Sequence, residues 1–566
     1  MSAEGTIEKE WMLVDLASFT KAESIEKVEN TENTTNLTEQ LAADFKILKT
    51  FTSVQYVSCS ILPVKVIKIF EERLDRYFYT INNLKDPKLE DVIVLASCFI
   101  LMTCIDNSVK SDLPQENTYL SELHLIRSMA LLKEKELNNK TILETMCNFY
   151  ELGRLYKKLK NPKKSLYCLN KALELYFLYT KGEDEFPVPI DAVTVTGFYG
   201  NLFELNTVHL LDRVYLSTLS ILIRSSDDFE YGLIDTEKIA TYMHKLLMKL
   251  LKTVPSSINH NAWALEAIQL AEFFLCCNCF IECKDHLCAA SVMMMKYYND
   301  MYVKCKAETS SKEKDYVSLK FKNVVSIIDM IWVKYGLIIL YLSRKRLLHK
   351  EEKDRPREIV KSELKSIIQS NRKRMKLIFT DVKEEFTKFI HVMPDNYITD
   401  YSDAKILFIR ILNLLHNVKT HALASVSAEF RTEIAHYTSK AYKYLASYEH
   451  DKIKQIKLQK RRIDVLEDCL KTLSVTDNLN HCIFIWFELA VINSTILGIR
   501  IENIHNKKLT TEELAEINLL VKNSVHYFQL YLDQSKPIDT QVDSYRIMSH
   551  FNLRYKKTLR YVTLIE

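Results

Sequence analysis

The sequence predicts an all-α protein, a tetratricopeptide-like right-handed α-solenoid of antiparallel helix hairpins in two subdomains. The chain of 566 residues contains only 8 glycines and 10 prolines, whereas strand-rich chains need glycine at most of their turns. Apolar residues recur at helical spacing through long segments, which predicts amphipathic helices. Two segments also repeat the order of large and small residues that lets paired helices approach closely.

The clearest repeat is FYELGRLYKKLKNPKKSLYCLNKALELY, residues 149–176. Asn161-Pro162 marks a turn between two predicted helices. Small residues are needed where the two helices meet, and large residues fill the space between them. The predicted core positions are Phe149, Leu152, Gly153 and Tyr156 on the first helix, and Ser165, Leu169 and Ala172 on the second.

The same spacing recurs in LEAIQLAEFFLCCNCFIECKDHLCAAS, residues 265–291, which holds five of the thirteen cysteines. Cys276, Cys279, Cys283, His286 and Cys288 could supply four zinc ligands, but Cys283 and Cys288 would point to different helix faces. We interpret the cysteines as core and turn thiols, with a metal site and a reactive thiol as alternatives. The predicted core positions here are Ala267, Leu270, Ala271 and Phe274, followed by Cys283, Leu287 and Ala290.

Charged and proline-bearing stretches predict four parts of the chain. Residues 1–50 form an N-terminal segment that is expected to be partly disordered, and 51–305 form a tetratricopeptide-like subdomain. Residues 306–356 form a loop and linking helix, and 357–566 form a C-terminal helical subdomain.

The most apolar run, Val92 to Ile105, has 14 residues and is shorter than the roughly 20 that cross a bilayer. It predicts a buried helix.

Composition and motifs predict a binding protein rather than an enzyme. The sequence lacks the glycine-rich phosphate loops, the nucleophile elbow and the zinc-protease motif, so no catalytic residue or cofactor is predicted. A net charge of +4 gives no global attraction to nucleic acid or to an anionic membrane. The N-terminus does not resemble a signal peptide, and we expect a cytoplasmic protein without direct membrane insertion.

Three sets of charged residues are candidate binding surfaces. The acidic set is Glu183, Asp184 and Glu185 in a proline-bearing loop, with Asp227, Asp228 and Glu230 in a later segment. The second set would lie on the concave face of the best repeat and consists of Tyr150, Arg154, Lys157 and Lys158. The third is the basic amphipathic segment 451–473, which suits an acidic partner, calmodulin or a membrane surface. Solvated helix faces and loops are the alternative for each set.

The segment 265–291, following Ala262-Trp263-Ala264, resembles a segment of the KIF-binding protein family, which consists of kinesin-binding tetratricopeptide proteins. Further stretches resemble the family in the same order. They are IWVKYGL (331–337), YITD (397–400), KLQKRRIDVLE (457–467) and YFQLYLD (527–533).

This resemblance implies a non-enzymatic helical solenoid that clasps the motor domains of selected kinesins and covers their microtubule-binding elements. It implies a cytoskeleton-associated protein that is monomeric when free. The microtubule-binding surface of a kinesin is basic because tubulin is acidic, so Glu183, Asp184 and Glu185 are a plausible contact. Two rival interpretations are a generic adaptor that holds a peptide tail of a chaperone or complex subunit, and a zinc- or thiol-dependent enzyme built on residues 276–288.

Overall fold

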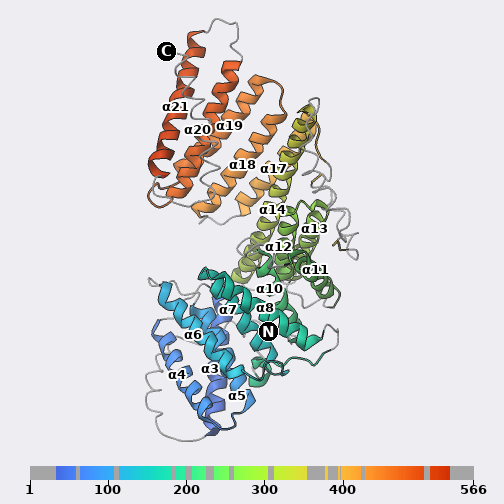
Figure 1. Cartoon of the computed structure of the whole chain (residues 1–566), viewed down its shortest axis with the longest axis vertical. Helices are drawn as coiled ribbons and strands as arrows, with labels where there is room; N and C mark the ends of the chain where they lie inside the picture. Colours follow the sequence, from blue (N-terminus) through green and yellow to red (C-terminus); the bar gives the residue numbers. More distant parts are fainter. Residues whose placement is uncertain are drawn as a thin grey trace. The chain divides into compact units, whose positions relative to one another are not determined.

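A computed structural model shows that every regular element among the described residues is a helix (Figure 1). Successive helices pair as antiparallel hairpins, which confirms the predicted all-α array of helix hairpins in this part of the chain. The residues described are 34–58, 64–106, 114–181, 186–197, 207–224, 235–253, 260–303, 311–352, 377–379, 393–394, 397–421, 427–502 and 510–535.

Contacts between residues divide the chain into two compact units. Unit 1 comprises Met1–Phe273 and Met295–Ser318, and unit 2 comprises Phe274–Met294 and Leu319–Glu566. The subdomain limits expected from the sequence stay a prediction. The helices are α3 (Thr34–Ser58), α4 (Val64–Asn83), α5 (Leu89–Asp106), α6 (Pro114–Leu132), α7 (Ile142–Lys158), α8 (Pro162–Thr180), α9 (Ala192–Thr196), α10 (Thr207–Arg224), α11 (Thr236–Thr253), α12 (His260–Cys276), α13 (Phe280–Tyr297), the π-helical turn η3 (Tyr298–Val303), α14 (Ser311–Glu352), α17 (Tyr401–His421), α18 (Ala428–Tyr448), α19 (Lys452–Lys471), α20 (Leu479–Glu502) and α21 (Thr511–Ser535).

The core at the start of unit 1 is formed by α3 to α6 and α9. Leu41, Phe45 and Leu48 of α3 follow helical spacing and are all buried. The apolar run 92–105 lies within α5 and is buried along most of its length, as predicted. Residues 34–50 therefore belong to helix α3, although the sequence assigns them to a separate N-terminal part.

The α7/α8 hairpin shows why its small residues are needed. All seven predicted core positions of this repeat are buried. Ser165 donates a hydrogen bond of 2.8 Å to the carbonyl of Gly153, across the two helices. A Cβ atom on Gly153 would lie 2.6 Å from Cδ2 of Leu169. In the turn, Lys160 has a left-handed φ of 54°, and Asn161 caps α8 by accepting from the Lys164 amide.

We expect Gly153→Ala to destabilise unit 1 by about 1–3 kcal/mol, because the added methyl group overpacks a fully buried contact. Gly498→Ala is the matched control. No atom lies within 4 Å of the Cβ that it would add, and alanine in an open helical position is favoured over glycine by about 1 kcal/mol. Urea unfolding should therefore shift in opposite directions for the two variants. A shift of the same sign in both would contradict the close-packing argument.

The turn between α12 and α13 positions the cysteine-rich segment. Asn278 has a left-handed φ of 57°, and the Cys279 amide donates to the carbonyl of Phe274 at 2.8 Å, which closes the helix end. The predicted core positions of this repeat are all buried, Cys283 among them with 0% exposure.

Unit 2 contains a second core between α18 and α21, centred on Trp486, Leu489 and Ile492 of α20. Tyr448 of α18 donates to the carbonyl of Leu340 in α14 at 2.9 Å.

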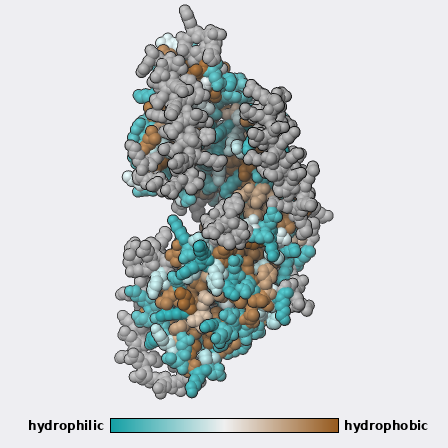
Figure 2. Space-filling model, viewed as in Figure 1, coloured by the Kyte–Doolittle hydropathy of each residue, from teal (hydrophilic) through white to brown (hydrophobic). Residues whose placement is uncertain are grey.

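Residues 318–348 within α14, and α20 as a whole, are apolar and long enough to cross a membrane, but 67% and 61% of their most apolar windows are buried inside the protein. Burial of this kind is typical of core helices. On the face of unit 1 seen in Figure 2, hydrophobic side chains lie in patches separated by hydrophilic ones.

Candidate protein-binding face

The side chains predicted on α7 lie along one side of the helix, because they are spaced three to four residues apart. Arg154 and Lys158 are exposed, and Tyr150 and Lys157 are half-buried. The Arg154 guanidinium donates to both carboxylate oxygens of Glu151, at 3.0 and 3.1 Å. It also lies 5.7 Å from the centre of the Tyr150 ring. Tyr150 and Arg154 therefore belong to one cluster, and the two lysines lie on the following turn.

Helices α10 and α12 extend this cluster. Arg224 and Glu266 both interact electrostatically with the Tyr150 hydroxyl. The Ser220 hydroxyl lies within hydrogen-bonding reach of Gln269 and of the Glu266 carboxyl. We call the resulting cluster the mixed-charge face and define it as Tyr150, Glu151 and Arg154 of α7, Arg213, Ser220 and Arg224 of α10, and Glu266 and Gln269 of α12, with Ser220 fully buried beside the others.

Partial burial changes the chemistry of the mixed-charge face. Burial raises the pKa of Glu266 to about 7, against the opposing effects of the Ser220 hydrogen bond, Arg224 and Arg213. It also raises the pKa of Glu151, despite the neighbouring Arg154, and the pKa of Tyr150 to about 12. Tyrosine and arginine in partly desolvated positions are typical of binding hot spots. The arginines of the face are exposed to an acidic partner, whereas Glu151 is paired with Arg154 and one carboxyl oxygen of Glu266 is inaccessible.

Of the residues that form this face, the sequence predicted only Tyr150 and Arg154, and their role in binding stays a prediction. Ser220, Arg224 and Glu266 come from two other helices and match no local motif, so only the tertiary packing brings them beside Tyr150. The predicted acidic residues Glu183, Asp184 and Glu185 lie outside the described residues, as do Asp227, Asp228 and Glu230. Their role in binding stays a prediction.

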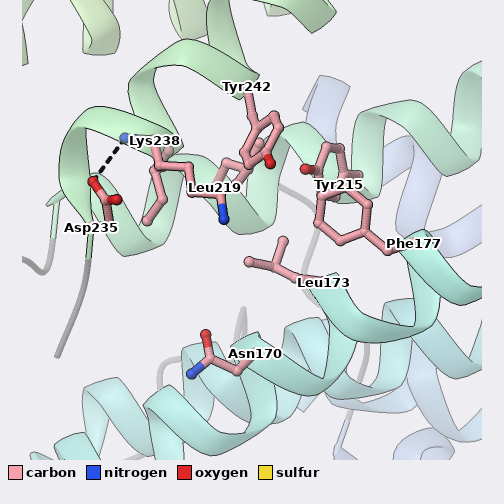
Figure 3. Close-up of a pocket in the computed structure, with 9 residues that line it drawn as sticks. Asn170, Leu173, Phe177, Tyr215, Leu219, Asp235, Lys238 and Tyr242 are labelled. Carbon is pink, nitrogen blue, oxygen red and sulfur yellow. Dashed lines mark hydrogen bonds between the residues drawn. The ribbon is translucent and has the colours of Figure 1, made fainter. Parts of the chain in front are cut away.

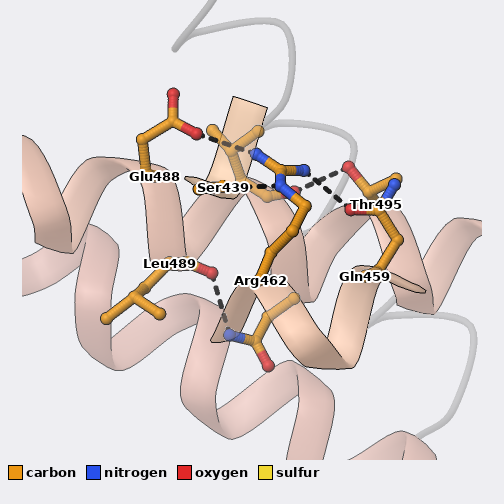
Figure 4. Close-up of polar contacts among 8 residues, drawn as sticks. Ser439, Gln459, Arg462, Glu488, Leu489 and Thr495 are labelled. Carbon is orange, nitrogen blue, oxygen red and sulfur yellow. Dashed lines mark hydrogen bonds and ion pairs between the residues drawn. The ribbon is translucent and has the colours of Figure 1, made fainter. Parts of the chain in front are cut away.

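The basic segment 451–473 forms α19 and its adjoining residues, and most of its charges are paired. Lys460 contacts Glu516 of α21 at 2.8 Å, and Lys452 contacts Glu502 of α20 at 3.4 Å. Arg462 is buried, and Figure 4 shows its guanidinium between Ser439, Gln459 and Glu488. The segment therefore contributes to the internal packing of unit 2, which the sequence pattern did not reveal.

The cysteine-rich segment does not gather ligands around one point. Cys283 and Cys288 are buried, whereas Cys276 and Cys277 are exposed at the turn. The His286 ring lies between Phe274 and Phe379, with centroids 5.1 and 4.8 Å away, and its Nδ1 contacts the Glu282 carbonyl. In the part of the chain that the structure describes, no group of three or more His, Cys, Asp or Glu side chains is arranged to hold a metal ion. This arrangement gives no support to the zinc alternative.

Comparison with known proteins identifies relatives over most of the chain. The family model described as "KIF-1 binding protein C terminal" matches residues 261–555. The KIF-binding protein of Xenopus tropicalis is 24% identical over 435 residues, which cover 75% of this chain and 68% of the relative. That of Gallus gallus is 25% identical over 433 residues, 75% and 70% of the two chains. That of Drosophila melanogaster is 24% identical over 364 residues, 62% and 57% of the two chains.

Among solved structures, one titled "Kinesin binding protein (KBP)" aligns over 88% of both chains with 15% identity and a TM-score of 0.41. The family model covers more than half of the chain and includes the cysteine-rich segment, α14 and all the described helices of the second core. The chain therefore belongs to the KIF-binding protein family.

Proposed function

We propose that this chain binds the motor domains of selected kinesins, without catalysis, and holds them off microtubules. Membership of the KIF-binding protein family is the observation that carries the proposal, since the matching relatives are named for kinesin binding. The mixed-charge face supports it as a surface with tyrosine, arginine and carboxyl groups in partly desolvated positions. The proposed site of action is the cytoplasm, at the cytoskeleton.

Charge explains how such binding would compete with microtubule attachment. A motor surface that binds acidic tubulin is basic, and a protein that covers this surface needs carboxylates. The predicted loop supplies Glu183, Asp184 and Glu185, and the largely buried carboxyl groups of Glu151 and Glu266 on the mixed-charge face add their charge from a short distance. A motor held on these groups could not present the same surface to the filament.

The direct test is co-sedimentation of purified kinesin motor domains with microtubules, with and without the full chain at low micromolar concentration. We expect one or more motors to leave the pellet and to co-elute with the chain on gel filtration. If every motor stays in the pellet, the proposed function is wrong. Saturation of the mixed-charge face by a short peptide would instead favour the adaptor interpretation.

Motor binding should become stronger as the pH rises from 6 to 8. Glu266 has a pKa near 7, so its carboxyl group is mostly neutral at pH 6 and mostly ionised at pH 8. One additional charge pair near a surface contributes on the order of 1 kcal/mol, which predicts about a fivefold gain in affinity. Glu266→Gln should remove this gain, whereas Glu174→Gln, an exposed change on α8, should keep it. Equal pH profiles for wild type and Glu266→Gln would exclude Glu266 from the interface.

Neutralising the acidic loop should weaken motor binding and reduce its dependence on salt. The variant carries Glu183→Gln, Asp184→Asn and Glu185→Gln together, and its affinity is measured by fluorescence anisotropy between low and physiological ionic strength. Screening weakens charge pairs as salt rises, so the wild type should lose more affinity than the variant. If affinity and salt dependence are unchanged, the loop is not part of the interface.

A further inference from the structure

A small pocket lies between α8, α10 and α11, with a cavity volume of about 220 Å³. Figure 3 shows Asn170, Leu173 and Phe177 of α8 facing Lys238 and Tyr242 of α11 across this space. All of these helices belong to unit 1. None of these five residues was singled out by the sequence, because the pocket is formed by three helices from separate segments.

Aromatic rings form one wall of the pocket. Phe177 meets Tyr215 and Tyr242 edge to face, with both pairs of ring centroids 5.6 Å apart. Tyr215 is stacked on Tyr176 at 3.9 Å, which fixes the orientation of its ring. Phe177 nevertheless remains 39% exposed. Exposed rings that are held in place lose little conformational entropy on binding, which favours them as contact residues.

Two polar groups lie at the pocket, and of these Lys238 is accessible to a ligand. The Tyr215 hydroxyl is buried, since the residue is only 4% exposed, and it has no hydrogen-bond partner among the described residues. This oxygen has less than 1 Å² of accessible surface, so a ligand in the open pocket would not reach it. Lys238 is exposed, lies 5.9 Å from the centre of the Tyr242 ring and forms no ion pair with a described residue. The Asp235 carboxylate is occupied in capping α11.

The size and surroundings of the pocket indicate a peptide side chain rather than a free small molecule. Small-molecule pockets usually have volumes of about 300–1,000 Å³, which exceeds the volume here. Apolar surface also continues beyond the pocket along α8, where Tyr167 is 62% exposed and Leu178 is 53% exposed. Tyr167 and Leu178 are aligned with each other on α8, about 60° and 80° around the helix from Asn170. An extended partner could contact all of this surface.

The rim carries exposed lysines, and two nearby carboxylates are already engaged: Asp235 caps α11, and Glu174 pairs with Lys171 at 2.7 Å. Lys238 and Lys245 are both exposed and lie seven residues apart, on the same side of α11. Lys163 is exposed on α8, seven residues before Asn170 and therefore on the same side of that helix. A partner with carboxylates on either side of an apolar residue would match this arrangement.

We propose that this pocket anchors an extended acidic peptide from a protein partner. A leucine or phenylalanine side chain fills the space beside Phe177 and Tyr242, and flanking carboxylates pair with Lys238 and Lys245. The chain would thereby recruit a second polypeptide to whatever occupies the mixed-charge face.

The geometry of α10 separates the two sites. A helix turns by about 100° per residue, so Leu219 in the pocket lies about 140° around α10 from Arg224 on the mixed-charge face. Tyr215 lies about 160° around from Arg213 by the same reckoning. The two sites are therefore on opposite sides of α10, and one ligand would not displace the other.

The test measures binding of a fluorescein-labelled twelve-residue peptide to the full chain by anisotropy. The peptide has a central phenylalanine with three aspartate or glutamate residues on each side. Two control peptides replace the phenylalanine with alanine, or the acidic residues with lysine. Because burying a phenylalanine contributes about 1.5–3 kcal/mol, the alanine peptide should bind about tenfold or more weakly. The lysine peptide should not bind measurably.

Variants of exposed residues locate the binding site without disturbing the core. Asn170→Trp fills the pocket and should abolish binding. Lys238→Glu should weaken it by about fivefold or more, since it replaces an attraction with a repulsion. Lys68→Glu is the matched control, because this exposed lysine lies on α4, away from the pocket, and it should change binding by less than about twofold. Circular dichroism and melting temperature verify that each variant folds.

Equal binding of the phenylalanine and alanine peptides, or undiminished binding to Asn170→Trp, would overturn the proposal. So would equal losses from Lys238→Glu and Lys68→Glu, because they would show attraction to net charge alone. These measurements contain no kinesin, so they are independent of the co-sedimentation result. Adding a motor that binds the chain should leave the anisotropy of the bound peptide undiminished, and release of the peptide would refute the separation of the two sites.

Discussion

Arg462→Met should destabilise unit 2 by about 3–5 kcal/mol, since removing one partner of a buried ion pair leaves the other charge uncompensated. Arg462 is 2% exposed. Its guanidinium donates to Glu488 at 2.9 Å, to Gln459 at 2.7 Å and to Ser439 at 3.1 Å (Figure 4). These partners come from α18, α19 and α20, so the loss should loosen three helices together. Urea unfolding gives the magnitude, and hydrogen exchange of peptides from these helices gives the location.

The neighbouring residue provides a matched control. Arg461 carries the same charge, but its side chain is 71% exposed and its contact with Asp464 is 3.8 Å long. An exposed pair of this kind contributes only about 0–1 kcal/mol, so Arg461→Met should have little effect. Combining Arg462→Met with Glu488→Gln should recover part of the loss, because it removes the uncompensated carboxylate. Similar losses from the two single variants would show that the network does not hold unit 2 together.

Arg462 also shows where sequence reasoning stops. The pattern of 451–473 correctly indicates an amphipathic helix, because helical periodicity is a local property. It cannot show which basic residue meets a carboxylate from another helix, so the sequence does not distinguish Arg462 from the other six basic residues of the segment. The same limit applies to the mixed-charge face. Tyr150 could be predicted from the repeat, whereas Glu266 and Arg224 lie beside it only through tertiary packing.

The hairpin cores were easier to predict for a physical reason. Gly153, Ser165 and Ala172 lie where two consecutive helices must approach closely, and that requirement involves only neighbouring segments. Cys283 could be assigned to a core position on the same grounds, and it is fully buried. The pocket at Phe177 could not be predicted in this way. Its walls depend on how one hairpin packs on the next. The spacing of side chains within a single hairpin does not predict that packing.

Glu144→Gln should stabilise unit 1 at pH 8 and have little effect at pH 5. Glu144 of α7 is 5% exposed, and one of its oxygens accepts from the Ser97 hydroxyl and the Ala192 amide, at 3.3 and 3.2 Å. Burial raises the pKa of this carboxyl group to about 8, and the charge of Asp191 acts in the same direction. No described basic residue pairs with it.

The sign of this stability change follows from comparison with the unfolded state, in which the pKa of glutamate is about 4.3. A folded pKa above the unfolded one means that the folded chain holds a proton that the unfolded chain releases. The stabilisation is complete below about pH 4.3 and is lost as the pH rises toward 8. The glutamine variant cannot ionise, so its stability should stay flat over this range, with a difference on the order of a few kcal/mol at pH 8.

Glu90→Gln distinguishes this effect from a general response to losing a carboxylate. Glu90 is nearly half exposed and pairs with Lys140 at 2.6 Å, and the hydrogen bond from Lys140 lowers its pKa. Its neutralisation should cause a small loss of stability at neutral pH, opposite in sign to the gain from Glu144→Gln. Urea unfolding at pH 5, 6.5 and 8 gives both profiles. If Glu144→Gln proves equally destabilising at all three values, the buried carboxyl group is ionised in the folded chain, and α7 must hold a compensating charge that its described neighbours do not supply.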